Sequence, residues 1–432
     1  MDNLDAARLQ MAMTLIFHIV FACIGMVMPF FMVVAHKKWL NTKNPAYLKL
    51  TKSWQKGVAI FFVTGAVSGT ALSFELGLLW PEFMKHAGPI IGMPFSLEGA
   101  AFFVEAIALG FYLYGWEKLP EKFHWFTGVI VGISGVLSGI LVVSANGWMN
   151  APSGFDFVNG AFINVDPVKA FFNPAWFTQA LHMTLAAFAS TGFAVAGVHA
   201  YQIYRKKQVE LHKKAFKIAI TFGAIAAILQ PISGDLSAKD IAKRQPVKLA
   251  AMEAHYETKE GAPLLIGGVV DQEKKEVSHK IEIPKALSFL AFGDFNAEVK
   301  GLNDFPEDVI PNVAIVHYAF QVMVGIGTLL LLVGILFFIS LKRTSLWRKQ
   351  WFWLFFAIMA PLGFIALESG WIVTEVGRQP WIIHNIMKTK DAVTPMPGMV
   401  YSFYMYVLLY GTLSVAVTWL MTRQIKLLNT SN

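Results

Sequence analysis

Polar and soft-sulfur side chains interrupt the apolar stretches of this sequence. His18 lies in IFHIVFACIG, His182 in TQALHMTLAAF and Met323 in YAFQVMVGIG. Ionisable groups inside a membrane are costly and mark functional sites by default, and a His/Met pair is an axial ligand set of low-spin heme. Gly325 and Gly327 would let a flat macrocycle approach the helix that carries Met323. A histidine that bonds a neighbouring helix and a methionine that only packs are the alternatives, and position alone leaves both interpretations open.

Two carboxylates share one face of an expected helix, in SLEGAAFFVE. Glu98 and Glu105 are seven positions apart, nearly two turns, so their side chains project within about 20° of each other. Buried carboxylates are expensive unless they ligate, pair or relay protons. The apolar segments contain hardly any Lys or Arg, so a proton relay is favoured over a structural salt bridge. Ser138, in GVLSGI of the next segment, is a candidate hydroxyl partner in that relay.

Two further groups of polar residues could carry chemistry. Glu375 and Arg378 follow Trp371 in GWIVTEVGRQPW, at a membrane boundary where retained charges indicate use. In the long polar connection, Lys248 and Glu253 lie five positions apart on an expected helix, VKLAAMEAHYE. Quinol oxidation needs hydrogen-bond partners for two hydroxyls and a carboxylate that takes protons, and this pair supplies both. A solvated surface would explain Lys248 and Glu253 equally well.

The composition identifies an integral membrane protein. Of the 432 residues, 55% are hydrophobic and only 15% are charged, whereas soluble domains are about 45–50% apolar and about 25% charged. A spanning helix needs roughly 20 mostly apolar residues. We therefore predict an all-α membrane protein with nine spanning segments, at about 12–35, 56–80, 89–115, 124–146, 176–203, 215–232, 312–341, 351–375 and 397–421.

The basic residues indicate membrane topology and not nucleic-acid binding. The net charge is +8, but Lys and Arg concentrate in alternate connections, which the positive-inside rule places in the cytoplasm. The N-terminus is then outside and the C-terminus cytoplasmic. Asp2 and Asp5 precede the first segment, which is too long for a signal h-region, so we expect that segment to be retained. The single cysteine, Cys23, excludes an internal disulfide and a cysteine-ligated iron–sulfur cluster.

The longest connection, about 233–311, is the one large polar element and is expected on the outer side. Its length and its Lys–Glu pattern predict a folded, functional cap over the membrane. The chain therefore divides into segments one to six (1–232), an extracytoplasmic loop (233–311) and segments seven to nine (312–432).

Four motifs together resemble subunit I of the cytochrome bd-type quinol oxidases, in the group with a short quinol loop. They are GWIVTEVGRQPW, PVKLAAMEA, SANGWMNAP and SLEGAAFFVE, and the resemblance covers essentially the whole chain. It implies one low-spin and one high-spin heme b, with heme d or a third heme b at a third position. It also implies membrane quinol and O2 as substrates, and a subunit II and a small single-span subunit as partners in a bacterial or archaeal cell membrane.

The resemblance also implies heme ligands, residue by residue. His182 and Met323 would be the axial ligands of the low-spin b heme. His18 and Glu375 would be ligands of the two high-spin hemes, and which of these hemes His18 holds stays open. Glu98 would be a ligand or a close neighbour of the same pair.

Proton and quinol chemistry follow from the same resemblance. Glu105 and Ser138 match positions of the family's proton channel, while Lys248 and Glu253 match residues of its quinol site. Arg378 would stabilise heme propionates or the junction for electron transfer.

Two positions complete the implied cofactor site. Trp371 of the GWIVTEVGRQPW motif would contact the hemes. Residue 321 is Gln where some family members carry Arg, a difference that would change the potential of the low-spin heme.

The resulting hypothesis is a terminal oxidase that generates a proton motive force without pumping. Quinol would be oxidised at the outer face under the 233–311 loop, and O2 would be reduced to water with cytoplasmic protons that pass Glu105. A heme–copper oxidase would need more intramembrane histidines, and a di-heme cytochrome b would need paired histidines on facing helices. The remaining alternative is a proton-coupled transporter that uses Glu98 and Glu105, which would be colourless.

Overall fold

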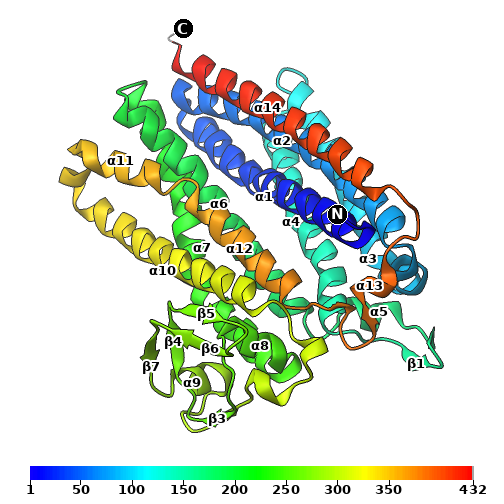
Figure 1. The fold of residues 1–432 in the computed structure, drawn as a ribbon. Helices are drawn as coiled ribbons and strands as arrows, with labels where there is room; N and C mark the ends of the chain where they lie inside the picture. The colour runs from blue at the N-terminus through cyan, green and yellow to red at the C-terminus, as the bar shows by residue number, and fades with distance from the viewer. Residues whose placement is uncertain (431–432) are drawn as a thin grey trace.

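The computed structural model describes residues 1–430 and consists mainly of long helices (Figure 1). Within those residues, nine helical spans are long and apolar enough to cross a membrane. They are α1 (Asn3–Thr42), α2 (Pro45–Leu79), α3 (Pro81–Tyr114), α4 (Glu121–Asn150), α6 (Trp176–Tyr204), α7 (Val209–Arg244), α10 (Val313–Lys342), α11 with α12 (Gln350–Ile358 and Leu362–Val376) and α14 (Met399–Asn429). The predicted all-α membrane architecture and its number of spans are confirmed.

Short polar side chains begin several of these helices. The Asp2 carboxylate accepts a hydrogen bond from the Asp5 N–H at 2.7 Å at the start of α1. Asn312 caps α10 in the same way, accepting from the Ile315 N–H at 3.0 Å. Such caps satisfy backbone donors that have no partner within the helix. They fix where the helices that carry His18 and Met323 begin.

Several helices, including α1, α2 and α3, extend beyond the predicted segments. The differences in α7 and in the eighth span have identifiable causes. Helix α7 is longer than 215–232 and continues to Arg244, because its polar end is a helix with i,i+4 ion pairs, such as Lys239–Asp235 at 2.7 Å. The predicted segment 351–375 forms two helices. Helix α11 ends at Ile358, and α12 begins at Leu362, directly after Pro361. Proline lacks the N–H that a continuous helix would need at this point.

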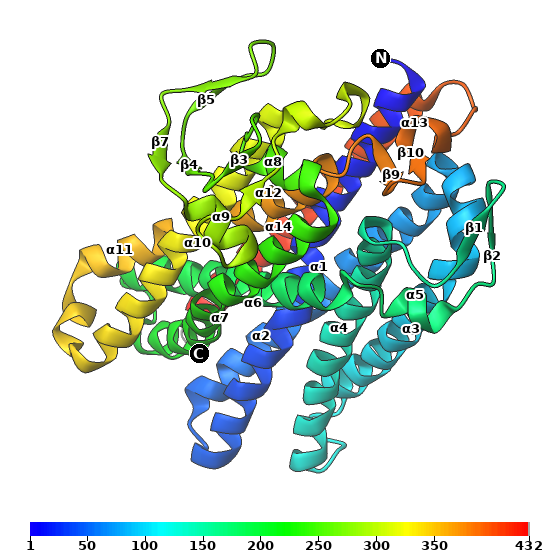
Figure 2. The ribbon, with the colours of Figure 1, turned by 90° about the horizontal axis from the view of Figure 1, so that it is seen from below.

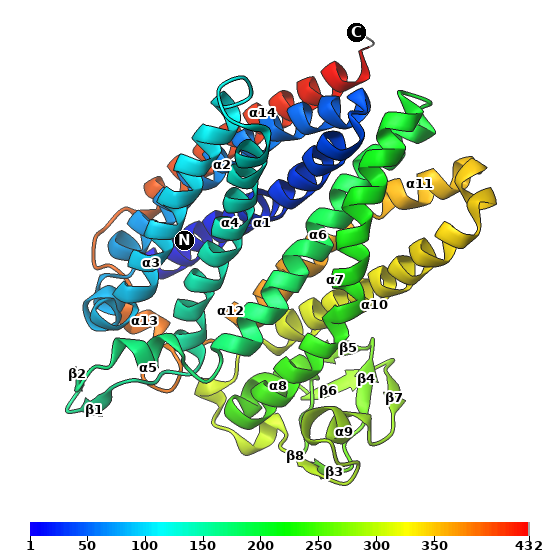
Figure 3. The same ribbon diagram turned by 180° about the vertical axis from the view of Figure 1, so that it is seen from behind.

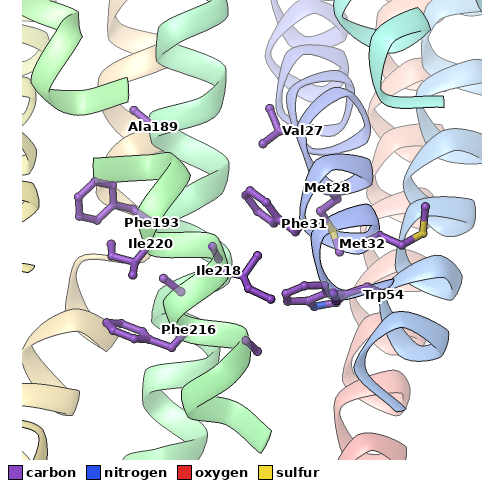
Figure 4. Close-up of a cluster of buried hydrophobic side chains, with 14 of the residues drawn as sticks. Val27, Met28, Phe31, Met32, Trp54, Ala189, Phe193, Phe216, Ile218 and Ile220 are labelled. Carbon is purple, nitrogen blue, oxygen red and sulfur yellow. The ribbon is translucent and has the colours of Figure 1, made fainter. Parts of the chain in front are cut away.

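The bundle core lies between the α1/α2 pair and the α6/α7 pair (Figure 4). Phe31 and Trp54 approach each other there with ring centroids 6.1 Å apart, whereas Phe193 and Phe216 point to the far side of α6/α7, where Phe216 packs against Phe356 of α11. All four side chains are buried. Dense apolar packing of this kind holds the helices in fixed positions, so that polar side chains on their other faces are also fixed.

The polar connections form small folded units at one end of the bundle (Figure 1, Figure 3). The long connection after α7 holds α8 (Pro246–Met252), α9 (Ala286–Phe292), three antiparallel strand pairs and two short 3-10 helices. The strand pairs are β3–β8 (Lys259–Glu260, Glu298–Val299), β4–β7 (Leu264–Ile266, Ile281–Ile283) and β5–β6 (Val269–Asp271, Glu276–Ser278). The 3-10 helices are η1 (Leu302–Asp304) and η2 (Glu307–Val309). The connection is thus a folded cap.

Two shorter connections lie at the same end of the bundle as this cap (Figure 2). The first holds the hairpin β1–β2 (Asp156–Val158, Ala161–Ile163) and α5 (Pro167–Phe171). The second holds β9 (Trp381–Ile383), β10 (Met387–Lys388) and α13 (Thr389–Ala392). At the opposite end, the connections are short turns and η3 (Thr344–Arg348).

Candidate functional site

A cavity of about 940 Å³ lies among the helices, within the range of small-molecule and cofactor sites. The sequence-predicted residues that line it come from α1, α3, α4, α12 and the turn after α12. They are His18, Glu98, Glu105, Ser138, Trp371, Glu375 and Arg378. Seven of the eleven residues proposed from the sequence therefore meet at one site. Their roles stay predictions, but their convergence could not have been read from spacing alone.

His18 has one ring nitrogen engaged and one available. Its Nδ1 lies 2.9 Å from the Ser68 hydroxyl oxygen, and that hydroxyl donates to the Thr64 carbonyl at 2.9 Å. Because the Ser68 proton is used there, His18 Nδ1–H is the donor to Ser68. The Nε2 lone pair is then free for a metal. A second-shell bond that fixes the tautomer in this way is typical of metal-ligating histidines.

The carboxylates of α3 lie against α4. The Ser138 hydroxyl donates to Glu98 Oε1 at 3.1 Å, so the predicted hydroxyl partner contacts Glu98. Gly135 lies beside the deeper carboxylate, because a Cβ added at Gly135 would come 3.5 Å from both Glu105 oxygens. Both carboxyl groups face the same cavity. The deeper carboxylate is thus in van der Waals range of α4 at Gly135, where an added Cβ would be tightest against the Met26 backbone, at 3.3 Å.

Glu375 and Arg378 form a close ion pair at the C-terminal end of α12, with 2.5 Å between Glu375 Oε2 and Arg378 Nη2. The Asn146 amide donates to the other Glu375 oxygen at 2.6 Å. Arg378 is buried, and among the described residues its Nε and Nη1 have no hydrogen-bond partner. Buried N–H groups without an acceptor are costly, and a carboxylate such as a heme propionate would satisfy both. The residues present therefore fit a heme, for which Arg378 would supply hydrogen bonds to a carboxylate.

His182 is held by α7 in the same manner as His18 is held by α2. Its Nδ1 lies 2.9 Å from the Ser233 hydroxyl oxygen, and Ser233 donates to the Gln230 carbonyl at 2.9 Å. The Gln230 amide also lies 3.2 Å from His182 Nε2. Neither His182 nor Met323 lines the large cavity, so any heme that they hold is separate from the group at His18.

The Met323 side chain lies against α12 at Gly370. A Cβ added at Gly370 would come 3.0 Å from the Met323 sulfur, so the methionine passes close over this glycine. On the Met323 helix, added Cβ atoms at Gly325 and Gly327 would meet nothing within 4 Å. Whether a heme lies against these glycines stays a prediction.

Lys248 and Glu253 are buried, so the solvated-surface interpretation is wrong for both. Each is only 3% exposed. The Lys248 ammonium donates to Asn150 Oδ1 at 2.7 Å, and burial, with a smaller effect of nearby Arg378, lowers its pKa to about 7. Burial raises the pKa of Glu253 to about 8. Both groups therefore titrate near neutral pH, as proton-transfer groups must.

Several contacting residues were missed by the sequence reasoning. Asn146 and Asn150 lie four apart in the SANGWMNAP motif, and that helical spacing was the available signal. Gln321, whose expected effect on a heme potential stays a prediction, also links α10 to the cap. Its amide donates to the Leu265 carbonyl at 2.9 Å and its oxygen accepts from the Gly267 N–H at 3.2 Å.

Fold and site together define a multi-pass membrane redox protein whose cavity suits heme. The chain belongs to the family of cytochrome bd terminal oxidase subunit I, whose model matches residues 6–428. It is 37% identical to the putative cytochrome bd menaquinol oxidase subunit I of Bacillus subtilis (strain 168), over 98% of this chain and 96% of that protein. It is 30% identical to the cytochrome bd ubiquinol oxidase subunit 1 of the same organism, over 99% and 94%.

The fold agrees with a solved member of the family. The bd oxidase from Geobacillus thermodenitrificans superposes with a TM-score of 0.93 at 37% identity, covering 98% of each chain. The chain is therefore a quinol oxidase subunit, an oxidoreductase of respiratory electron transport in the bacterial membrane. This membership confirms the resemblance and decides against the proton-coupled transporter.

Proposed function

We propose that this subunit oxidises quinol at the extracytoplasmic face and reduces O2 to water with protons taken from the cytoplasm. The observation that carries the proposal is the shared cavity, in which His18, Glu98, Glu375 and Arg378 converge. When bound, the hemes carry electrons and supply the oxygen chemistry. The protein supplies ligands, proton access and a dry environment. Proton motive force would arise from the opposite sides of proton release and uptake, without pumping.

The ligand assignments follow the donor chemistry. His182 and Met323 would hold the low-spin b heme, and the free Nε2 of His18 would hold one high-spin heme. Glu375 would hold the second high-spin heme, with Glu98 as a ligand or close neighbour. The second high-spin heme is heme d or a third heme b.

The remaining residues handle quinol and protons. Lys248 would donate a hydrogen bond to a quinol oxygen, and ionised Glu253 would accept a hydroxyl proton. Both lie in the cap, between its surface and the bundle. Glu105, two turns from Glu98 on α3, would deliver protons to the cavity, with Ser138 as a hydroxyl neighbour. Arg378 would bind propionates, and Trp371 lines the same cavity.

The test is a dithionite-reduced minus air-oxidised visible spectrum of the purified oxidase with its subunit II and small subunit, repeated with carbon monoxide. B-heme bands with a carbon monoxide response are expected, and a far-red chlorin band that shifts with carbon monoxide would assign heme d. A Glu105→Gln variant should keep every heme band and turn over slowly. Absence of heme absorbance from a well-folded complex would overturn the proposal.

A further inference from the structure

We propose that Asn150 is a positioning residue for quinol oxidation, which fixes the Lys248 ammonium at a set place relative to Glu375. The inference rests on the proposed role of Lys248 at the quinol site. It concerns the end of α4, which no proposed heme or quinol contact involves directly. Its basis is an unbroken series of hydrogen bonds from the cap to the large cavity.

The series crosses three elements. Lys248 in α8 donates to Asn150 Oδ1 at 2.7 Å. The Asn150 amide donates to the Asn146 side-chain oxygen at 3.0 Å and to its carbonyl at 2.9 Å. The Asn146 amide in turn donates to Glu375 at 2.6 Å, and Glu375 pairs with Arg378. One turn of α4 thus connects the cap with the cavity.

An amide suits position 150. Asn150 accepts from Lys248 with its oxygen and donates to Asn146 with its nitrogen, whereas an ionised carboxylate of the same length can only accept and a serine hydroxyl is shorter. The Gln245 amide adds a donor to the Asn150 carbonyl at 2.9 Å. Asn150 is 3% exposed, so water cannot replace these partners at low cost.

The stem of Lys248 is also confined. A Cβ added at Gly377 would come 3.0 Å from Lys248 Cγ and 3.3 Å from Lys248 Cε. Gly377 lies between Glu375 and Arg378 in sequence, so the lysine passes directly over the turn that carries the ion pair. With stem and head both held, the ammonium has one position. A buried ammonium that lost its acceptor would have to move or lose its proton.

A purely structural role for Asn150, as the residue that ends α4, makes a different prediction. In that case its replacement would reduce heme content, stability and every activity together. A positioning role affects the Michaelis constant for quinol and spares the hemes. The two roles are therefore separated by measuring quinol kinetics beside a reaction that does not use the quinol site.

The experiment uses the complete oxidase carrying Asn150→Leu, Asn150→Ser or Asn150→Asp, with Asn41→Leu, at an exposed position in the last turn of α1, as the matched control. Steady-state oxygen consumption is measured with a short-chain ubiquinol, a short-chain menaquinol and an artificial one-electron donor. We expect Asn150→Leu and Asn150→Ser to raise KM for quinol about tenfold or more. Asn150→Asp, which keeps an acceptor for Lys248, should stay within about threefold.

The heme content and the activity with the artificial donor should equal those of the native enzyme in all variants. A native KM in Asn150→Ser, or a parallel loss of heme and of every activity in Asn150→Asp, would overturn the inference. If Asn150→Leu does not assemble, Asn150→Ser and Asn150→Asp decide. Lys248→Ala separates the two proposals. An unchanged KM for quinol in that variant would contradict the proposed quinol site itself. A raised KM in Lys248→Ala together with a native KM in Asn150→Ser would contradict only the role of Asn150.

Discussion

His18 and His182 sit in matching environments on two different helix pairs. In each case Nδ1 lies 2.9 Å from a serine hydroxyl on the following helix, Ser68 or Ser233. A glycine follows each serine. A Cβ added at Gly69 would come 3.1 Å from His18 Cε1, and one at Gly234 would come 3.7 Å from His182 Cε1. A Ser-Gly dipeptide therefore orients each imidazole and leaves room for its ring.

Replacement of either serine should weaken heme binding at its own histidine only. Second-shell partners of metal-ligating histidines change affinity or activity about 10- to 100-fold, so Ser68→Ala and Ser233→Ala should each lower heme occupancy or shift one midpoint potential. Heme content and potentiometric titration of the purified complex measure this. Ser96→Ala is the control, because Ser96 only bonds the Gly92 carbonyl at 2.8 Å. Unchanged content and potentials in both variants would contradict the prediction.

Glu253 predicts the pH dependence of quinol oxidation. Burial raises the pKa of its carboxyl group to about 8, so below that pH the group is protonated and cannot accept a proton from quinol. We expect kcat/KM for quinol to rise with pH through about 8 and this rise to be absent in Glu253→Gln, whose rate should be low throughout. Parallel pH profiles of the two enzymes, with artificial-donor activity as the control, would refute the assignment.

At the residue scale the sequence predicted several residues that line one cavity, but not the side chains that contact them. The motifs and the cost of polar groups in apolar segments selected His18, Glu98 and Glu375, and all three line the cavity. Ser68 and Asn150 were not selected, because a serine or asparagine in a helix carries no signal until the residue on the opposite helix is known. Side-chain bonds between helices are a property of packing, which one sequence does not reveal.

Helices α6 and α7 approach most closely at a pair of glycines. A Cβ added at Gly192 would lie 2.4 Å from Gly223 Cα and 3.0 Å from the Ala219 carbonyl oxygen. Small residues allow helix backbones in membranes to pack in direct contact. Because His182 lies on α6 and Ser233 on α7, this contact also sets the distance across which the histidine is oriented.

Gly192→Ala should therefore destabilise the subunit and loosen the heme at His182. Overpacking of a tight core typically costs about 1–3 kcal/mol, and here the clash is with backbone atoms that cannot rotate away. Thermal loss of heme absorbance in detergent would measure the effect. Gly110→Ala on α3 is the matched control, because a Cβ there would meet nothing within 4 Å. Equal thermal stability of both variants would show that the close approach is unimportant.

The elements themselves were well predicted where hydrophobicity defines them. The nine spans were found because each contains a stretch of at least 18 residues with high mean hydropathy and few charges. The end of α7 was not found, since Asp235 and Lys239 interrupt the apolar pattern while their ion pair supports the helix. The small strand pairs of the cap were also missed, because two- and three-residue strands leave no period in the sequence.

In the whole molecule, the connections rich in basic residues lie at one end of the bundle, and the connections richer in acidic residues lie at the other end. Lys43 pairs with Glu121 at 2.9 Å, which joins the α1–α2 turn to the start of α4. Lys49 Nζ donates to the Thr430 carbonyl at 2.6 Å, which brings the end of α14 to the same place. The cap lies at the other end (Figure 3). The positive-inside rule then places the Lys43 end in the cytoplasm.

This orientation decides whether the proposed chemistry generates a proton motive force. Cysteine labelling can test it. Cys23 is buried and is the only cysteine, so an exposed cysteine added to the chain can be labelled selectively. A membrane-impermeant maleimide should label Glu273→Cys, in the cap, in intact cells. Lys206→Cys, in the exposed α6–α7 turn, should react only after permeabilisation. The reverse pattern would place quinol oxidation on the cytoplasmic side, so protons would be released and consumed in one compartment and no gradient would form.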